Sequence, residues 1–499
     1  MDQRISSHTS NGFITPDPIA PQEFSNAADA VAALEAIYER NTRFLCEAFE
    51  NLATEKPKGR YRAFYPQVSL ATTSFGMVDS RLSYGHVVSP GHYATTLTRP
   101  ALFRSYLTTQ FELLLKNHGT PLTISESDTP IPLHFAFGEG AYVEAAVADK
   151  LDMPLRDLFD TPDLATTDDE IVNGLYEPGP GELLPLAPFK AQRIDYSLAR
   201  LSHYTATAAH HFQNFVLFTN YQFYIDEFCE HARALMAEGN SGYECFVEPG
   251  NLITPSGQSA PSEGVAPPRL PQMPAYHLKR KDNCGITMVN IGVGPSNAKT
   301  ITDHVAVLRP HAWLMLGHCA GLRNSQALGD YVLAHAYVRE DHVLDDDLPA
   351  WVPIPALAEV QVAVQEAVAD VTGLEGYDLK RIMRTGTVST IDNRNWELRD
   401  QRGPVQRLSQ SRAIALDMES ATIAANGFRF RVPYGTLLCV SDKPLHGELK
   451  LPGMASAFYK TQVNQHLKIG LLAMEKLAAM PPERLHSRKL RSFFETAFQ

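Results

Sequence analysis

The chain has 499 residues, of which 44% are hydrophobic and 20% are charged, and its formal net charge at pH 7 is −12. This composition is that of a globular protein with room for two or three domains, and it excludes a disordered chain. The negative charge argues against nucleic acid or an anionic membrane as the main partner, because both require a basic surface.

The sequence carries no sign of export or of a metal site. It has no apolar run of about 18 residues, and its first residues lack the apolar core of a signal peptide. The six cysteines are far apart and form no C-x-x-C pair, and the apolar neighbours of Cys319 and Cys439 suit buried thiols. We therefore expect a protein of the reducing cytoplasm that binds neither a membrane nor zinc.

The first part of the chain is predicted to be an α+β domain at residues 25–190, preceded by a flexible arm. Residues 1–24 are polar and contain prolines, which is typical of a mobile terminus. The expected elements are a helix from Ser25, strands at 67–73 and 92–98, and a helix from Pro100 to just before Gly119. We find no catalytic motif in this domain.

The rest of the chain, residues 191–499, alternates between strands and helices. Apolar runs predict strands at 215–218, 286–291, 313–316, 330–337 and 385–390, and helices are expected at 224–236, 297–308, 357–371 and 457–479. Residues 248–274 are rich in Pro, Gly and Ser, which predicts a long surface loop or, alternatively, a linker between domains. The alternation predicts a largely parallel sheet that is covered by helices on both faces.

Three acids follow two apolar runs near the end of this domain. Residues 413–416 and 435–440 read as strands, and residues 418–426 between them read as a helix that ends at Gly427. Asp417 and Glu419 follow the first strand and Asp442 follows the second. Because the carboxyl ends of neighbouring parallel strands share one crevice, we expect a pocket with converging carboxylates. The alternative is that two of these acids cap helices and only one contacts a ligand.

The turn GVGPSNAKT at residues 292–300 is a second candidate for ligand contact. Gly292 and Gly294 allow the backbone to approach a ligand closely. The polar side chains around the following helix N-terminus, where free N–H groups favour an anion, are Ser296, Asn297, Lys299 and Thr300. A phosphate-binding P-loop is not expected, because the glycines that it needs are replaced by Val293 and Ala298. A purely structural tight turn remains the alternative.

A third stretch of small residues, GHCAG, follows the strand at 313–316. Gly317 would bring the backbone near a ligand, and His318 is either a ligand contact or a core histidine.

These motifs together resemble those of a known family. LDMESA at 416–421 is similar to the VEMEA-type ribose motif of the hexameric purine nucleoside phosphorylases, CVSD at 439–442 to their catalytic strand end, and GHCAG to their GSCG turn. Over nearly the whole chain, including TLTRPALFRSYL in the N-terminal domain, the sequence most resembles the AMP nucleosidases. The resemblance implies an α/β fold, in which a three-layer α/β/α nucleoside-phosphorylase-like domain with a largely parallel central sheet follows an α+β regulatory domain.

The resemblance also implies a reaction, the hydrolysis of AMP to adenine and ribose 5-phosphate, and roles for particular residues. Asp442 matches the position that protonates N7 of the purine, which would require a raised pKa, and Ser441 lies beside it. Glu419 matches the residue that binds the ribose hydroxyls, and Met418 would pack beneath the sugar. Asp417 has a weaker counterpart. Trp396 is either a platform for the base or a core tryptophan.

The sequence departs from the phosphorylases at their phosphate site. The positions that correspond to an arginine and a serine there are Met315 and His318, and Thr219, Asn220 and Tyr221 replace a glycine-rich, arginine-bearing loop. This favours water as the nucleophile. The alternatives are a phosphate-dependent purine nucleoside phosphorylase and a non-catalytic nucleotide sensor, although a sensor has no need for a purine-protonating acid.

The ligands of the 5′-phosphate and of any effector are less clear from the sequence. Candidates for the 5′-phosphate are Lys299 with the polar residues around it, Arg323, and the basic segment 484–491. The resemblance further implies a homohexamer, no cofactor for the chemistry, activation by Mg-ATP and inhibition by phosphate. Arg99 and Arg104 would either meet an effector phosphate or form structural salt bridges.

Overall fold

The computed structural model describes residues 5–10, 12–75, 83–138, 153–398, 400–449, 454–486 and 490–499. The chain divides into two compact units, which we describe separately. Unit 1 comprises Met1–Arg200 together with Arg491–Gln499, and unit 2 comprises Leu201–Leu490.

Unit 1 is built on two small sheets. The first has the order β1 (Ser7–Ser10), β2 (Phe13–Pro16), β4 (Arg60–Tyr61), and the second has the order β3 (Gln22–Phe24), β7 (Leu122–Pro130), β5 (Phe64–Thr72), β6 (Gly91–Thr96), β8 (Leu184–Pro185). The prediction of a flexible arm at residues 1–24 is therefore wrong for the described residues 5–10 and 12–24, which contain β1, β2 and β3. The backbone of these polar residues is satisfied by pairing with distant strands, such as β3 with β7.

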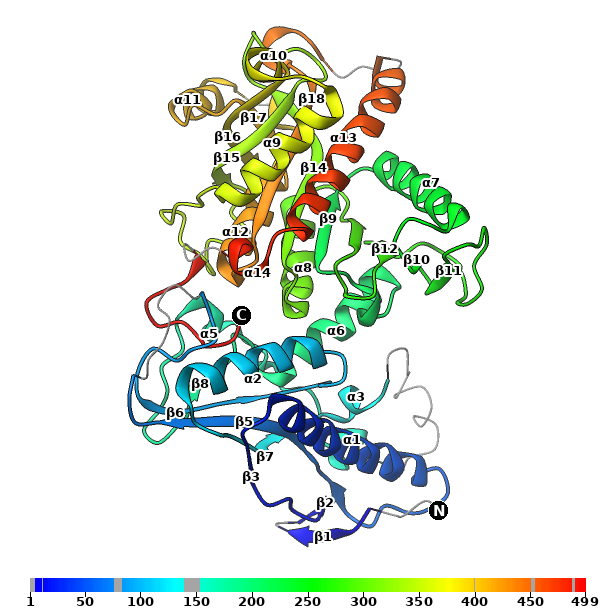
Figure 1. The fold of residues 1–499 in the computed structure, drawn as a ribbon, viewed down its shortest axis with the longest axis vertical. Helices are drawn as coiled ribbons and strands as arrows, with labels where there is room; N and C mark the ends of the chain where they lie inside the picture. Colours follow the sequence, from blue (N-terminus) through cyan, green and yellow to red (C-terminus); the bar gives the residue numbers. More distant parts are fainter. Residues whose placement is uncertain are drawn as a thin grey trace. The chain divides into compact units, whose positions relative to one another are not determined.

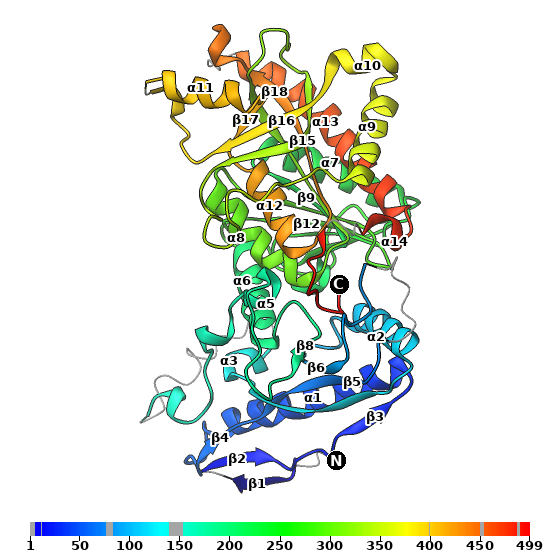
Figure 2. The same ribbon diagram turned by 90° about the vertical axis from the view of Figure 1, so that its left-hand side faces the viewer.

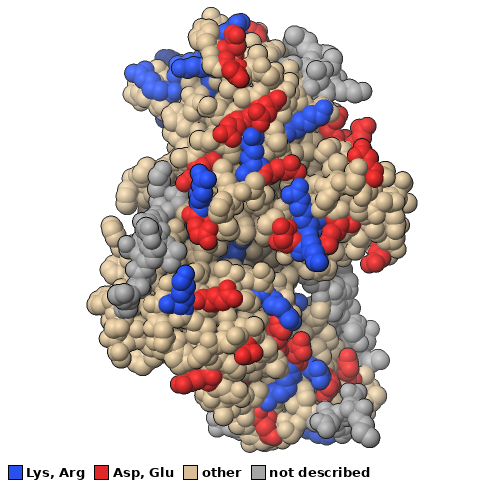
Figure 3. Space-filling model, in the orientation of Figure 1, with Lys and Arg blue, Asp and Glu red and all other residues tan. Residues whose placement is uncertain are grey.

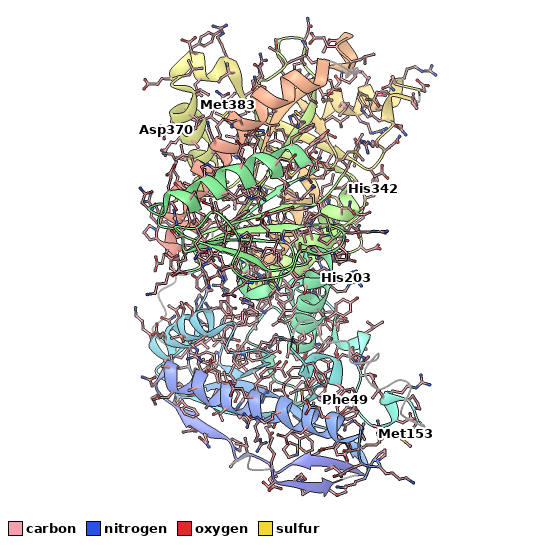
Figure 4. All side chains as sticks on the ribbon, turned by 90° about the vertical axis from the view of Figure 1, so that its right-hand side faces the viewer. Phe49, Met153, His203, His342, Asp370 and Met383 are labelled. Carbon is pink, nitrogen blue, oxygen red and sulfur yellow. The ribbon has the colours of Figure 1, made fainter. Side chains whose placement is uncertain are left out.

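Two long helices complete unit 1. Helix α1 (Ala27–Asn51) begins at Asn26, whose side-chain oxygen accepts a hydrogen bond from the N–H of Asp29 at 3.1 Å. Helix α2 (Arg104–His118) ends at Gly119, which has a φ of 62°. Phe49 of α1, labelled in Figure 4, belongs to a core cluster that also contains Tyr65 and Phe159. The shorter elements are α3 (Leu133–Ala136), η1 (Leu155–Asp157), η2 (Leu164–Thr166) and α5 (Glu170–Asn173).

The last residues of the chain belong to unit 1, although the sequence suggested that they end the second domain. Phe498 is 1% exposed, and its N–H donates to the carbonyl of Leu186 at 2.9 Å. The N–H of Gln499 donates to the side chain of Gln110 at 2.9 Å. Helix α6 (Ala191–Thr205) contains the division between the two units.

Unit 2 contains a ten-stranded mixed sheet. Its order is β11 (Leu252–Pro255), β10 (Cys245–Glu248), β12 (Ala275–Lys279), β13 (Ile286–Asn290), β9 (Phe215–Thr219), β14 (Ala312–Gly321), β17 (Ala415–Asp417), β16 (Met383–Ile391), β15 (Tyr331–Glu340), β18 (Tyr434–Asp442). Strand β14 also pairs with β18, so the last five strands of this order close on themselves as a barrel. A buried apolar cluster takes at least one residue from each barrel strand: Cys319, Val332, Ala334, Val388, Ala415, Leu438 and Val440.

Three details of the sheet differ from the sequence prediction. Half of the ten strand pairings are antiparallel, so the sheet is less parallel than expected. Strand β14 continues through Gly317 and Gly321, where a turn was predicted, with an irregularity between Cys319 and Ala320. The predicted loop at 248–274 contains β11, which forms a hairpin with β10.

Helices cover both faces of this sheet (Figures 1 and 2). One layer contains α7 (Gln222–Glu238), α9 (Ala358–Thr372) and α13 (Met454–Ala478), and the opposite layer contains α8 (Pro295–Val305) and α12 (Ser420–Phe430). Helix α12 does not end at Gly427 as predicted. A Cβ at Gly427 would lie 2.6 Å from Cδ1 of Tyr434, so this glycine allows the helix to pack closely on β18. The remaining short elements are η3 (Ala209–His211), η4 (Ala306–Leu308), α10 (Gly376–Ile382), η5 (Trp396–Leu398), α11 (Arg402–Gln410), η6 (Pro444–His446) and α14 (Pro482–Leu485).

Within the described part of the chain, no helix is both long and apolar enough to cross a membrane. On the face drawn in Figure 3, acidic and basic side chains are interspersed among the residues drawn in colour.

Candidate active site

Glu419 stands at the centre of the candidate site, because polar groups from three strand ends meet at its carboxylate. It follows β17, and its side chain is buried, with the residue 1% exposed. Its Oε1 accepts a hydrogen bond from the N–H of Gly294, beyond β13, at 2.6 Å. Its Oε2 accepts one from Nδ2 of Asn220, which follows β9, at 2.9 Å. The parallel pairing of β9 and β13 places these two donors at the same edge of the sheet.

Burial disfavours the ionised form of Glu419. Burial and, to a smaller extent, the neighbouring Asp417 raise the pKa of Glu419 to about 8, while hydrogen bonds from the backbone of Gly294 and Met418 and from the Asn220 side chain lower it only in part. These donors are neutral, so the described residues give the ionised carboxylate no counter-charge. A positive charge that developed next to Glu419 would therefore be stabilised.

Asp417 has a structural task at the start of α12. Its Oδ2 accepts the N–H of Ser420 at 2.9 Å and also the Ser420 hydroxyl, and its Oδ1 accepts the hydroxyl of Thr390 at 2.5 Å. Burial raises the pKa of Asp417, and these hydrogen bonds oppose the rise. Of the two helix-capping acids that the alternative required, Asp417 is the one whose side chain bonds to the first residue of α12.

Asp442 ends β18 and approaches the same region from another direction. The prediction that β17 and β18 are parallel neighbours is wrong, because β14 lies between them, antiparallel to β17 and parallel to β18. The carboxylates of Asp417 and Asp442 nevertheless both act on Cys319 of β14. Burial raises the pKa of the Cys319 thiol, and electrostatic interactions with Cys439, Asp417 and Asp442 raise it further. The hydroxyl of Ser441 donates to Oδ1 of Asp442 at 2.6 Å.

The glycine-rich turn brings backbone N–H groups to the site. Gly292 and Gly294 have φ angles of 68° and 118°, which favour glycine, and the turn they form leads into α8 at Pro295. The polar side chains here bond to the local backbone: Asn297 donates to the carbonyl of Val293, and Thr300 donates to that of Ser296. This turn therefore contributes mainly through its main chain, as the hydrogen bond from Gly294 to Glu419 illustrates.

His318 and Gly317 lie on the neighbouring strand β14. The His318 ring is buried, with its centroid 5.0 Å from that of Tyr221 and 5.5 Å from that of Tyr224. A Cβ at Gly317 would lie 3.4 Å from Oδ1 of Asn220, so the two residues are in close contact. Asn220 and Tyr221 were not predicted as site residues. The signal that would have identified them is their position directly after the fully buried strand β9.

Comparisons with known proteins identify the family of this chain. Residues 29–183 match the family model described as Bacterial AMP nucleoside phosphorylase N-terminus, and residues 273–469 match the one described as Phosphorylase superfamily. The AMP nucleosidase of Escherichia coli (strain K12) is 48% identical over 482 residues, which cover 95% of this chain and 98% of that protein. This chain belongs to the AMP nucleosidase family. A second AMP nucleosidase, from Escherichia coli O157:H7, matches over the same share of both chains with the same identity.

Solved structures are also similar to a little more than half of this chain. The AMP nucleosidase from Bacteroides thetaiotaomicron VPI-5482 is 28% identical and covers 56% of this chain and 96% of its own, with a TM-score of 0.40. A purine nucleoside phosphorylase from Toxoplasma gondii is 19% identical and covers 55% of this chain and 96% of its own, with a TM-score of 0.39.

Lys299 was the first candidate for the 5′-phosphate, but its charge is already balanced. Its ammonium lies 2.8 Å from a carboxylate oxygen of Asp303 and 3.3 Å from one of Asp347. Arg429 pairs with the same two acids, at 3.4 Å and 3.1 Å. Lys299 thus belongs to an ion-pair network between α8, α12 and the segment after β15, and it adds little net positive charge to the site.

Arg323 and Trp396 differ in how they are held. The Arg323 guanidinium is half-buried and has no hydrogen-bond or ion-pair partner among the residues that the structure describes.

Trp396 is 7% exposed and packs in a core cluster with Leu322 and Leu416, as the core alternative predicted. Met418 is half-buried next to Glu419. Part of the basic segment 484–491, residues 487–489, lies outside the described residues.

The two N-terminal arginines form ion pairs within unit 1. Arg99 lies 3.2 Å from Asp195, and Arg104 lies 2.7 Å from Glu35, which is the structural alternative given for them. Among the described residues, no group of three or more His, Cys, Asp or Glu side chains is placed to hold a metal ion.

Proposed function

We propose that this protein hydrolyses the N-glycosidic bond of AMP and releases adenine and ribose 5-phosphate. The observation that carries the proposal is the Glu419 carboxylate, which is buried, accepts hydrogen bonds from neutral donors among the described residues, and stands at the meeting point of β9, β13 and β17. Cleavage of a glycosidic bond builds positive charge on the ribose, and such a carboxylate stabilises that charge. The membership of the AMP nucleosidase family supports AMP as the substrate.

In this reaction a water oxygen bonds to the anomeric carbon as the bond from that carbon to adenine N9 breaks. The electron pair of the broken bond goes to the purine, and Asp442 gives its proton to N7 of the leaving base. The attacking water releases one proton and one proton returns to Asp442, so that AMP and water are converted to adenine and ribose 5-phosphate. Glu419 accepts hydrogen bonds from the ribose hydroxyls, and Met418 packs beneath the sugar.

For the 5′-phosphate we propose the Arg323 guanidinium and the backbone N–H groups at the start of α8, at Ser296 and Asn297. The first N–H groups of a helix have no acceptor within the helix and attract anions. Arg323 is supported by its having no partner among the described residues, whereas Lys299 is already paired with Asp303 and Asp347.

Regulation is proposed to reside in unit 1. Residues 29–183 match a family model of their own, and all the catalytic candidates lie in unit 2, which fits a regulatory N-terminal domain. We propose Mg-ATP as the activator, phosphate as the inhibitor and a homohexamer as the assembly, and no cofactor for the chemistry itself.

A phosphate-dependent phosphorylase is the alternative, and the surroundings of β14 do not favour it. Met315 is fully buried, and His318 lies against two tyrosine rings, so neither position supplies the cation that a phosphate dianion needs.

The product profile tests the proposal. Purified protein is incubated with AMP in phosphate-free buffer with and without Mg-ATP, and separately with adenosine plus phosphate. We expect adenine and ribose 5-phosphate from AMP, and a faster reaction with Mg-ATP. Ribose 1-phosphate that forms only when phosphate is supplied would establish the phosphorylase instead. In the same assay Asp442→Asn should still bind AMP and should lose most of its turnover; full turnover would remove Asp442 from the mechanism.

A further inference from the structure

A cavity apart from the candidate active site lies at the start of β16 in unit 2. Its volume is about 750 Å³, and it is lined by residues of α10 and β16 together with Gln365 of α9 and Ile414, which precedes β17. Small-molecule sites typically have volumes of about 300–1,000 Å³. Among the described residues, none of the catalytic candidates lines this cavity. It is therefore large enough for a ligand of its own.

Part of the lining is apolar or aromatic. Leu379 and Met383 are buried, Ile414 is half-buried, and Met383 is labelled in Figure 4. Tyr377, by contrast, is 77% exposed, so its ring does not serve the core. An exposed aromatic ring beside an apolar surface suits a flat ring system, which can stack on the one and cover the other.

The rest of the lining is cationic. It includes Lys380, Arg381 and Arg384, and no Asp or Glu occurs among the described lining residues. The Arg384 guanidinium is held in place, because its Nη1 donates to the Ser325 hydroxyl at 2.7 Å and its Nη2 donates to the Ser325 carbonyl. Arg381 lies 3.6 Å from Asp378, and both side chains are exposed, so this ion pair is weak and a stronger anion can replace it.

These three cations contrast with the charge of the whole chain, which is −12. Burial raises the pKa of Asp330, at the start of β15, and Arg384, Lys443 and Arg381 lower it in part. This acid lies outside the lining and is shared with Lys443, so it offsets only part of the positive charge around the cavity. Arginine and lysine side chains grouped in this way match phosphate groups, and three of them match more than one phosphate.

We infer that this cavity binds a small molecule that joins an aromatic ring system to at least two phosphate groups, which is the chemistry of a nucleoside diphosphate. The ring system stacks on Tyr377, and the phosphates accept hydrogen bonds from Lys380, Arg381 and Arg384. The inference goes beyond the proposed function, because binding at this place does not depend on the hydrolysis of AMP. The site lies in unit 2, so it is also distinct from any effector site in unit 1.

Calorimetric titration of the full chain with ADP and with pyrophosphate tests the inference. The variants are Tyr377→Ala and the double variant Lys380→Ala with Arg381→Ala, and Arg402→Ala on α11, an arginine that is also exposed, is the matched control. ADP bound at the active site would give a signal that is the same in all of them. All variants should keep the wild-type thermal unfolding and AMP turnover, because the changed side chains are exposed and lie outside the candidate active site.

The two halves of the ligand should respond differently. In the double variant we expect Kd to rise about 100-fold for both ADP and pyrophosphate, because two hydrogen bonds to charged groups are lost. In Tyr377→Ala, Kd for ADP should rise about 10-fold, while that for pyrophosphate stays unchanged, since stacking on an aromatic ring is worth about this much. The control should bind both probes as the wild type does.

Three results would overturn the inference. They are a wild type that does not bind ADP, an ADP affinity that is the same in the wild type and both variants, and a Tyr377→Ala variant with unchanged ADP affinity, which would leave a site for phosphate alone. A wild type that does not release ribose 5-phosphate from AMP would contradict the proposed function and would leave the binding result standing.

Discussion

Two buried carboxylates, one in each unit, have opposite surroundings. Asp195 of unit 1 and Glu419 of unit 2 are each 1% exposed, and burial raises the pKa of both. Asp195 accepts hydrogen bonds from the hydroxyls of Tyr65 at 2.7 Å and Thr98 at 2.8 Å, and it pairs with the Arg99 guanidinium at 3.2 Å. Glu419 accepts hydrogen bonds from the Asn220 amide and from the backbone of Gly294 and Met418.

The difference lies in the counter-charge. The charge of Asp195 is balanced inside the fold by Arg99, and this cluster connects β5 and the segment after β6 to α6. In the part of the chain that the structure describes, no cation pairs with Glu419, which makes the burial of its charge costly in the free protein and useful in the reaction. The contrast therefore separates Asp195, which the fold neutralises with a cation, from Glu419, whose described partners are all neutral.

Replacing Glu419 with Gln should have the largest effect. The change removes the charge but keeps the shape, and the Asn220 amide can turn to accept the new N–H group. We expect kcat for AMP to fall about 1,000-fold, which corresponds to about 4 kcal/mol of lost transition-state stabilisation. Stability at neutral pH should be equal or higher, because a carboxylate with a raised pKa costs free energy once the pH exceeds its unfolded value.

Adenine release and thermal unfolding measure the two parts of this prediction. Glu230→Gln, on the exposed face of α7, is the matched control and should leave both unchanged. A Glu419→Gln variant that is unstable but fully active would mean that Glu419, like Asp195, is a structural acid.

Replacing Asp195 with Asn should produce the opposite pattern. It leaves Arg99 without its partner and weakens the hydrogen bonds of Tyr65 and Thr98, so we expect unit 1 to lose about 3 kcal/mol of stability. Calorimetry of the whole chain measures this, with Asp128→Asn on the surface of unit 1 as the control. AMP turnover should persist at temperatures where the fold is intact. Loss of turnover without loss of stability would contradict the structural role of Asp195.

The sequence predicted those parts of the site that depend on local pattern. Glu419 and the Gly292–Gly294 turn were identified because polar or glycine residues directly follow apolar runs, and such runs form strands that end at one edge of a sheet. The helices α1, α2, α7 and α9 were located for a similar reason, since their boundaries depend on periodicity and on caps such as Asn26 and Gly119.

The parts that were missed depend on contacts between distant residues. The pairing of β3 with β7 orders a segment that looks flexible, and the pairing of β14 with β18 closes a barrel that alternation alone does not indicate. Of the two acids that neutralise Lys299, Asp303 is four residues away and could have been read from the helix spacing, whereas Asp347 lies far away in the sequence. Asn220 was passed over because its partner Glu419 is equally remote.

Replacing Asp417 with Asn should have the smallest effect and sharpens the contrast between neighbouring acids. Asn keeps an oxygen for the Ser420 N–H, so stability should change by about 1 kcal/mol or less. The lost charge should matter more to Glu419, whose pKa it raises. If ionised Glu419 is required, kcat/KM falls as the pH drops through that raised pKa, above the usual glutamate value of about 4.3. This fall of kcat/KM on the acidic side of the pH profile is the acidic limb, and in Asp417→Asn it should occur at lower pH.

The pH dependence of kcat/KM for AMP, measured from about pH 5 to about pH 9, reports this shift. Asp346→Asn, an exposed acid elsewhere in unit 2, should leave the limb where it is in the wild type. A limb that stays in place in Asp417→Asn would mean that the charge of Asp417 does not reach Glu419 because the Thr390 and Ser420 hydrogen bonds already absorb it. A limb that moves to higher pH would contradict the role of Glu419 as the ionised group.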